Sequence, residues 1–318
     1  ALARQESIVA MNLRSAMVAP LFDNRRVIGL LYADSTQLDR PFDRERLGFF
    51  TLLANLLAVK ITNTRLQEIE RERERMAQQL EVAAMLQRRL LPEQLPTVED
   101  YDLFAVQIPC FEVAGDLYDI TTLADGRLVL VLGDVTGKGI GAALLMTNVM
   151  ATLRALYRQP VDLRLWMTQI HEQVLASSDA LHSVTLFLGL LDPLGGRLDY
   201  ASAGHDPALL IPREGSSQKL MATGVPAGML TGMTYETSTV EIARGSTLAV
   251  YSDGIREAQA DEEDPDSMFG LERLKRGIQR RQGESLSQIA DGVLEDLRAH
   301  VGAIGLDDDV TLLLLRRK

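Results

Sequence analysis

Two runs of aliphatic residues near the start of the chain predict a β-hairpin. Ala16–Pro20 and Val27–Ala33 have the composition of strands, and the pair Asp23-Asn24 between them favours a turn. Asp43 then reads as a helix cap, because a strongly apolar stretch from Leu47 to Ile61 follows it. A hairpin and one helix are too small to fold alone, so the region predicts the end of a larger domain.

The next region predicts one long helix, because residues 63–91 contain neither glycine nor proline. Apolar residues recur there in steps of three and four, with two polar exceptions, which is the pattern of a heptad seam. The seam positions are Leu66, Ile69, Arg73, Met76, Leu80, Ala83, Gln87 and Leu90. We predict a parallel coiled-coil dimer; the alternative is a single solvated helix packed on the following domain.

After Pro92 the pattern becomes rich in strands, with helices that come in pairs. The expected strands are Tyr101–Gln107, Leu117–Thr121, Arg127–Gly133, Ser183–Leu191, Arg197–Ala203, Ala208–Pro212, Tyr235–Ile242, Thr247–Ser252 and Val310–Leu315, and the expected helices are Ile140–Tyr157, Leu163–Ser178, Leu271–Gln279 and Ser285–Ala299. Short connections between strands indicate antiparallel pairing. Paired helices favour an α+β fold in which helices cover antiparallel sheets, not a doubly wound parallel sheet.

Charge and composition narrow the possible partners. The chain has 44 acidic and 33 basic residues and a formal net charge of -11. An acidic chain is a poor partner for nucleic acid or for an anionic membrane surface. Its single cysteine, Cys110, excludes an intramolecular disulfide, and its apolar runs are too short to cross a bilayer. We therefore expect a cytoplasmic protein without membrane insertion.

Four aspartates stand where predicted strands begin or end. Asp116 and Asp308 each come just before a strand, and Asp134 and Asp253 each come at the end of one. Carboxylates at the rim of a sheet are partly desolvated, and a cluster of them repels itself unless a cation neutralises it. Oxygen ligands suit Mg²⁺ or Mn²⁺, and two such ions activate water and hold a phosphoryl group.

For any single aspartate, a turn cap is the better explanation, and Asp119 and Asp307 in the same stretches need no other. Flanking glycines favour the metal hypothesis for the other four positions. Gly115, Gly133 and Gly254 let the backbone approach an ion closely, so that a carbonyl such as that of Val135 can join the coordination.

A glycine-rich turn at residues 137–142 invites a nucleotide-binding interpretation. It fails as a Walker loop, because no glycine stands five positions before Gly137 and because Gly139 follows Lys138. It is also a weak dinucleotide turn, since another helix, not a strand, comes after its helix. The helix N-terminus there remains suited to a phosphate or carboxylate.

Seven short motifs, in order along residues 86–318, resemble the PPM metal-dependent protein phosphatases, in their bacterial SpoIIE/RsbU-like branch. Each motif alone is weak, and the ordered set is specific. The motifs are Leu86-Gln87-Arg88-Arg89-Leu90-Leu91-Pro92, Val113-Ala114-Gly115-Asp116-Leu117-Tyr118-Asp119, Gly133-Asp134-Val135-Thr136-Gly137-Lys138-Gly139, Ala203-Gly204-His205-Asp206-Pro207-Ala208, Tyr251-Ser252-Asp253-Gly254, Phe269-Gly270 and Asp308-Asp309-Val310-Thr311.

The resemblance implies a four-layer α-β-β-α sandwich with a site for two Mn²⁺ or Mg²⁺ ions. Carried over by motif, Asp134 bridges both ions, Asp116 and the Val135 carbonyl bind one, and Asp253 and Asp308 bind the other. Asp134, Asp116 and Asp253 are thus the expected catalytic residues. The resemblance also implies that a hydroxide bridging the ions attacks phosphoserine or phosphothreonine directly.

Two positions depart from family patterns. Ala114 stands where a second glycine is common in this branch, and Thr136, as in this bacterial branch generally, stands where eukaryotic relatives have a histidine, so leaving-group protonation has no assigned residue. Two further residues keep two interpretations each. Lys138 either binds substrate phosphate or is a solvated turn lysine. His205 is better explained as structural than as an acid or base.

The first region resembles the C-terminal part of a GAF sensor domain, through Arg14–Leu21 and Arg26–Tyr32. The predicted organisation is therefore a partial GAF-like unit at 1–62, a coiled-coil linker helix at 63–91 and a PPM phosphatase domain at 92–318.

The leading hypothesis is a signalling phosphatase in stress-response or sigma-factor regulation. By resemblance, its substrate is a phosphorylated STAS-domain anti-sigma-factor antagonist. Leu86, Leu90 and Leu91 at the end of the linker are the expected regulatory contacts, through which a sensor's state reaches the metal site. The alternatives are a non-catalytic dimeric scaffold of the same fold and a small-molecule phosphatase. The scaffold predicts loss of a metal-binding aspartate, and none of the four is lost.

Overall fold

The computed structural model of the protein describes residues 14–23, 25–36, 42–178, 182–261 and 263–318. These residues form two compact units, within 1–79 and 80–318, and the boundary between the units falls inside helix α2, Arg44–Arg88.

The first unit contains the predicted hairpin. Strand β1, Ser15–Asp23, pairs antiparallel with β2, Arg26–Ser35. Asn24, in the predicted turn, lies outside the described residues. The hairpin packs against the start of α2, where Phe50 and Ala54 are buried with Ala19. Asp43 caps this helix as predicted, because its Oδ1 accepts a hydrogen bond from the Arg46 N–H at 2.8 Å.

Helix α2 is longer than either helix expected from the sequence, since the stretch 47–61 and the seam that follows form one uninterrupted element. The seam residues Leu66, Ile69 and Met76 are 49–61% exposed. The apolar stretch makes part of α2 long and hydrophobic enough to cross a membrane, judged by length and composition alone. Helices of soluble proteins can also be this long and hydrophobic.

The second unit is built from two five-stranded sheets, in each of which all pairs are antiparallel. One sheet has the order β10-β7-β6-β5-β4 and the other has the order β3-β12-β11-β8-β9. Their strands are β3 Tyr101–Ile108, β4 Leu117–Thr122, β5 Leu128–Val135, β6 Val184–Asp192, β7 Arg197–Ala203, β8 Ala208–Ile211, β9 Gln218–Leu220, β10 Ser238–Glu241, β11 Thr247–Tyr251 and β12 Val310–Arg317.

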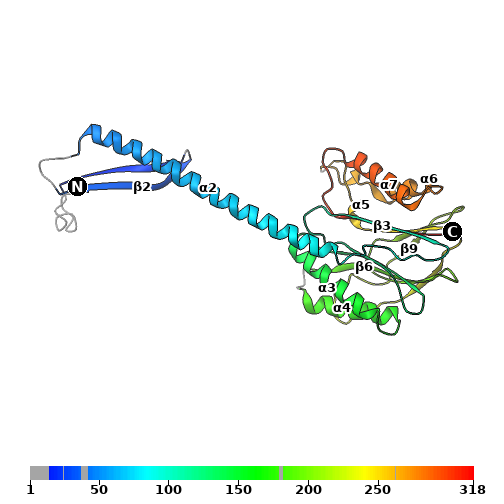
Figure 1. The fold of residues 1–318 in the computed structure, drawn as a ribbon. Coiled ribbons are helices and arrows are strands. Elements are labelled where there is room, and N and C mark those ends of the chain that lie inside the picture. The colour runs from blue at the N-terminus through cyan, green and yellow to red at the C-terminus, as the bar shows by residue number, and fades with distance from the viewer. Residues whose placement is uncertain (1–13, 24, 37–41, 179–181, 262) are drawn as a thin grey trace. The chain divides into compact units, whose positions relative to one another are not determined.

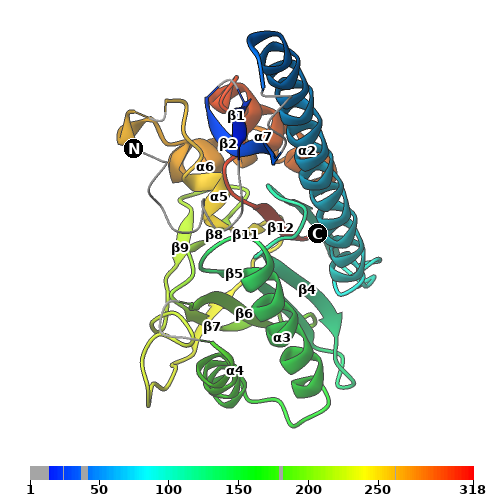
Figure 2. The same cartoon turned by 90° about the vertical axis from the view of Figure 1, so that its left-hand side faces the viewer.

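Two helix pairs cover the outer faces of these sheets (Figures 1 and 2). The helices are α3 Ile140–Leu156, α4 Leu163–Ser177, α6 Gly270–Arg280 and α7 Leu286–Val301, with the short α5 Asp253–Arg256 and the 3-10 turn η2 Pro265–Ser267. The predicted four-layer α-β-β-α sandwich is confirmed. The sequence interpretation missed β9, α5 and η2, and it made β10 longer than it is.

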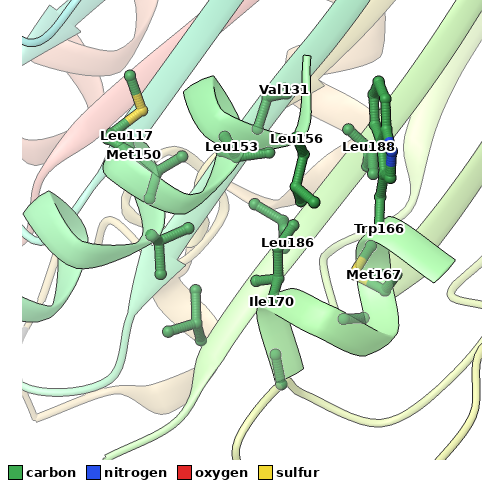
Figure 3. Close-up of a cluster of buried hydrophobic side chains, with 14 of the residues drawn as sticks. Leu117, Val131, Met150, Leu153, Leu156, Trp166, Met167, Ile170, Leu186 and Leu188 are labelled. Carbon is green, nitrogen blue, oxygen red and sulfur yellow. The ribbon is translucent and has the colours of Figure 1, made fainter. Parts of the chain in front are cut away.

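Alternation along the strands explains the layers, because successive side chains face opposite sides of a sheet. Val131 of β5 faces helices α3 and α4, in one core with Trp166 and Met150 (Figure 3), and Val129 belongs to the same core. Leu130 faces the other way, into the core between the sheets. Three apolar cores thus hold the four layers together, and they fix where the strand ends lie.

Candidate metal centre

The four aspartates predicted as ligands come from the ends of both sheets. On the first sheet, Asp116 directly precedes β4 and Asp134 is the penultimate residue of β5. The pairing of Leu117 with Gly133 places these two aspartates side by side. On the second sheet, Asp253 follows β11 and Asp308 lies two residues before β12, whose strands pair antiparallel. Each sheet therefore contributes two aspartates to the site.

Electrostatic interactions show that the carboxylates of the two sheets approach each other. Burial, and then the charge of Asp134, raise the pKa of Asp116 well above its usual range. Burial, followed by the charges of Asp253 and Asp308, raises the pKa of Asp134 to about 7. Burial and Asp308 raise the pKa of Asp253 to about 6. Each carboxylate thus disfavours ionisation of its neighbours, as close like charges do.

Asp308 forms an ion pair with a lysine. Its Oδ2 lies 3.1 Å from the Lys138 Nζ, and the side chains of Lys138 and Asp308 are 44% and 40% exposed. The Lys138 ammonium also donates a hydrogen bond to the carbonyl of Asp307. The structure therefore places Lys138 on a proposed metal ligand, a contact that neither sequence interpretation of this residue included.

A hydrogen-bond network under the aspartates connects the two sheets. Thr311 Oγ1 donates to Asp116 Oδ2, and the Thr311 N–H donates to Ser252 Oγ at 2.9 Å. Asp309 accepts from the backbone N–H groups of Cys110 at 2.8 Å and Gly115 at 2.7 Å. Asp309 therefore positions the segment before Asp116, a role that sequence reasoning missed although the residue stands in a quoted motif.

The glycines of the acidic motifs serve close backbone packing. A Cβ on Gly254 would lie 2.1 Å from the carbonyl oxygen of Asp309, and one on Gly133 would lie 2.7 Å from Leu186 Cδ1. A Cβ on Gly115 would lie 3.1 Å from the Val135 carbonyl oxygen and 3.6 Å from Asp134 Oδ1. Gly115 thus leaves open the space in which these two oxygens converge.

These groups fit a divalent cation by their chemistry. Buried carboxylates with raised pKa values need either protons or a cation, and their oxygens are the ligands that Mg²⁺ and Mn²⁺ prefer. In the described part of the chain, no three acidic, histidine or cysteine side chains already surround one point as a complete ligand set does. Ion binding would therefore draw these carboxylates closer together.

Two residues with open interpretations lie outside the cluster. Asp119 is buried under α3 and accepts a hydrogen bond from the Tyr157 hydroxyl at 3.0 Å. His205 is buried, and its Nδ1 lies 2.9 Å from Thr185 Oγ1. Burial lowers the pKa of His205 to about 4, so the ring is neutral at physiological pH. His205 thus has structural contacts, as the simpler interpretation expected, whereas Asp119 lies within β4 and does not cap a turn.

The end of α2 contributes to the second unit. Leu91 is buried in the core beneath α3 and α4. Leu86 and Leu90 line an apolar groove of about 420 Å³ with Ile140 and Leu144 of α3. Helix α3 begins just after Lys138. Leu86 and Leu90 therefore lie next to the helix that directly follows the second acidic motif.

Comparison with known proteins agrees with this architecture. Residues 124–318, more than half of the chain, match the family of stage II sporulation protein E (SpoIIE), and residues 2–61 match the GAF domain. Phosphoserine phosphatase RsbU of Bacillus subtilis is 26% identical over 244 residues, which cover 76% of this chain and 70% of RsbU. Protein IcfG of Synechocystis sp. is 27% identical over 266 residues, which cover 75% of this chain and 41% of IcfG.

A solved structure shows the same fold. The SiaA-PP2C domain of Pseudomonas aeruginosa superposes with a TM-score of 0.68 at 21% identity, over 78% of this chain and 99% of that domain. Matches to the curated relatives are partial, since this chain spans less than half the length of IcfG.

Proposed function

Because the chain belongs to the SpoIIE family and contains a GAF segment at residues 2–61, we propose that it is a metal-dependent protein serine/threonine phosphatase. The observation that supports this most is the convergence of four aspartates from the ends of two facing sheets. Burial and the neighbouring carboxylate charges raise the pKa values of Asp116, Asp134 and Asp253, which supports a cation as the group that neutralises them.

The proposed ligands divide between two ions. Asp134 contributes to both, Asp116 and the Val135 carbonyl to one, and Asp253 and Asp308 to the other. RsbX, which has the same fold with a TM-score of 0.54 at 15% identity, was solved in complex with magnesium. Two divalent ions supply, when bound, an activated water and charge stabilisation for in-line attack on phosphorus.

The protein's own groups orient this site. Thr311 and Asp309 fix Asp116 and the segment before it, and Lys138 adds a positive charge next to Asp308. Thr136, at the position of the eukaryotic histidine, has its Oγ1 3.0 Å from Ser183 Oγ. No nucleophilic side chain is needed, because the proposed reaction is a direct hydrolysis of the phosphate ester.

The proposed substrate is a phosphoserine or phosphothreonine of a signalling protein, of the STAS class. The relative RsbU carries the name phosphoserine phosphatase, which supports phosphoserine as the group that is hydrolysed. We propose further that the chain acts in the cytoplasm as a homodimer through the middle of α2, where the seam residues Leu66, Ile69 and Met76 are exposed. The GAF segment would then regulate the phosphatase domain through that helix and the contacts of Leu86, Leu90 and Leu91.

The test is phosphate release from a serine-phosphorylated STAS-domain protein, with Mn²⁺ or with EDTA. We expect release that requires the metal and that falls at least about 100-fold in Asp253→Asn, because a metal ligand is lost. Asp119→Asn is the matched control, since it neutralises a buried aspartate outside the cluster and should keep the activity. Folded protein that releases no phosphate from this substrate with Mn²⁺ would contradict the proposal and favour a non-catalytic scaffold.

A further inference from the structure

Gln87 occupies an unusual position in the last turn of α2. Its side chain is only 8% exposed, whereas its neighbours Leu86 and Arg88 are exposed. The heptad pattern placed Gln87 in a seam facing a partner helix, but the structure turns it toward the phosphatase domain. A buried amide needs hydrogen-bond partners, so its contacts show what this position does.

Both ends of the Gln87 amide bind the same backbone residue. Its Nε2 donates to the carbonyl oxygen of Ala114 at 2.6 Å, and its Oε1 accepts from the Ala114 N–H at 3.0 Å. This reciprocal pairing fixes the orientation of the amide, because the flipped group would oppose donor to donor and acceptor to acceptor. Ala114 is itself buried, so water does not replace these bonds.

The segment that Gln87 holds leads directly into the acidic cluster. Ala114 comes two residues before Asp116, and the segment lies in neither helix nor strand. Its other contacts come from the opposite direction: Asp309 accepts from the Gly115 N–H, and Gln107 Nε2 donates to the Asp116 carbonyl at 2.8 Å. Gln87 thus hydrogen-bonds this loop from the side of α2, beside Ala84, which is buried with Val113.

We propose that Gln87 is a positioning residue, which acts through Ala114 to set where Asp116 stands relative to Asp134 and the Val135 carbonyl. The inference rests on the proposed metal site. A Cβ on Gly115 would lie 3.1 Å from that carbonyl oxygen, so the loop runs close to it, and a displaced Ala114 changes how Asp116 stands against it. A shift of the end of α2 would break both hydrogen bonds and leave a buried N–H and C=O of the loop unpaired, and the loop would relax.

The competing explanation is that Gln87 only satisfies two buried backbone groups and contributes to stability. Metal affinity separates the two explanations. Loss of an outer contact that orients a ligand typically weakens metal binding 10- to 100-fold, whereas general destabilisation of a folded domain does not.

We would measure Mn²⁺ binding to the full chain by calorimetry, for wild type, Gln87→Met and Gln87→Asn. Methionine keeps the size and removes both hydrogen bonds; asparagine keeps the amide but is too short to reach both groups. We expect Mn²⁺ to bind at least about tenfold more weakly in both variants. The control is Gln282→Met, which removes an amide bond to the Pro212 carbonyl, 2.9 Å long, away from the acidic motifs.

Thermal unfolding without metal shows which variants are folded. If Gln87→Met does not fold, the comparison is made with Gln87→Asn. Wild-type affinity in a folded Gln87 variant would overturn the inference and leave the proposed function intact. An equal loss in Gln282→Met would overturn it as well, since the effect would then be general. Wild-type protein that binds Mn²⁺ but releases no phosphate would instead contradict only the proposed function. No Mn²⁺ binding by the wild type would contradict both.

Discussion

At the scale of single residues, the site is defined by how charges are distributed over its carboxylates. Asp116 is buried and Asp134 is partly buried, and in the described part of the chain the groups that act on them are other carboxylates and hydroxyls. Asp308 is more exposed and pairs with Lys138. A cation that binds here therefore displaces protons from Asp116 and Asp134 and competes with the Lys138 ammonium for Asp308.

Lys138→Gln should bind Mn²⁺ more tightly than the wild type, because the ammonium competes with the ion for Asp308. The pair is partly exposed, so we expect a gain of only about two- to fivefold in a calorimetric titration. A lysine that binds substrate phosphate instead predicts unchanged Mn²⁺ affinity and a higher KM. Unchanged affinity and unchanged KM would assign Lys138 to the solvated turn.

His205 should make the stability of the protein sensitive to acid. Its pKa is lowered to about 4 in the folded protein by burial, whereas an unfolded histidine titrates near pH 6.5. The folded state therefore binds fewer protons, and its stability is retained above pH 6.5 and falls as the pH drops toward 4, by about 3 kcal/mol at most. Urea unfolding at pH 7 and pH 4.5 should show a smaller pH effect in His205→Gln. An equal pH effect in both proteins would contradict this assignment.

At the scale of secondary-structure elements, α2 divides into parts with different surroundings. Its first turns bury Phe50 and Ala54 against the hairpin, its middle exposes Leu66, Ile69 and Met76, and its last turns enter the phosphatase domain. An exposed apolar stripe of heptad spacing favours pairing with a second helix.

Ile69→Glu should convert a dimer to a monomer, because it places a charge in the seam. Light scattering after size-exclusion chromatography gives the mass directly. Gln78→Glu is the matched control, since it adds the same charge at an exposed position outside the seam. A wild-type chain that is monomeric at micromolar concentrations would favour the single solvated helix.

Leu80→Pro tests whether the linker regulates the phosphatase. Proline removes a helical hydrogen bond and bends or breaks α2 at the boundary between the two units. We expect the sandwich to stay folded, because its three cores lie beyond this residue, and the rate of phosphate release to change. An unchanged rate in a folded variant would argue against regulation through the helix.

At the scale of the whole molecule, the strands were predictable because a single physical rule sets their pattern. In β5 and β12, residues that alternate along the strand face either a helix pair or the other sheet, so both strands read as continuous apolar runs with an aspartate at one end. Short elements such as β9, with 3 residues, carry too little pattern to be read.

The supporting contacts were not predictable in the same way. Thr311 and Asp116 are 195 positions apart, and Gln87 and Ala114 are 27 apart. No periodicity links such positions; the packing of two sheets and a helix brings them together. Sequence thus gave the candidate ligands, whereas the structure was needed to find the side chains that hold them in place.

The central claim is that the facing sheet ends form a centre for two divalent ions. The most direct test is the number of Mn²⁺ ions bound, measured by calorimetry for wild type and Asp134→Asn. We predict two ions in the wild type and at most one in the variant, because Asp134 is the residue proposed to contact both. One ion or none in the wild type, or two in Asp134→Asn, would contradict the account.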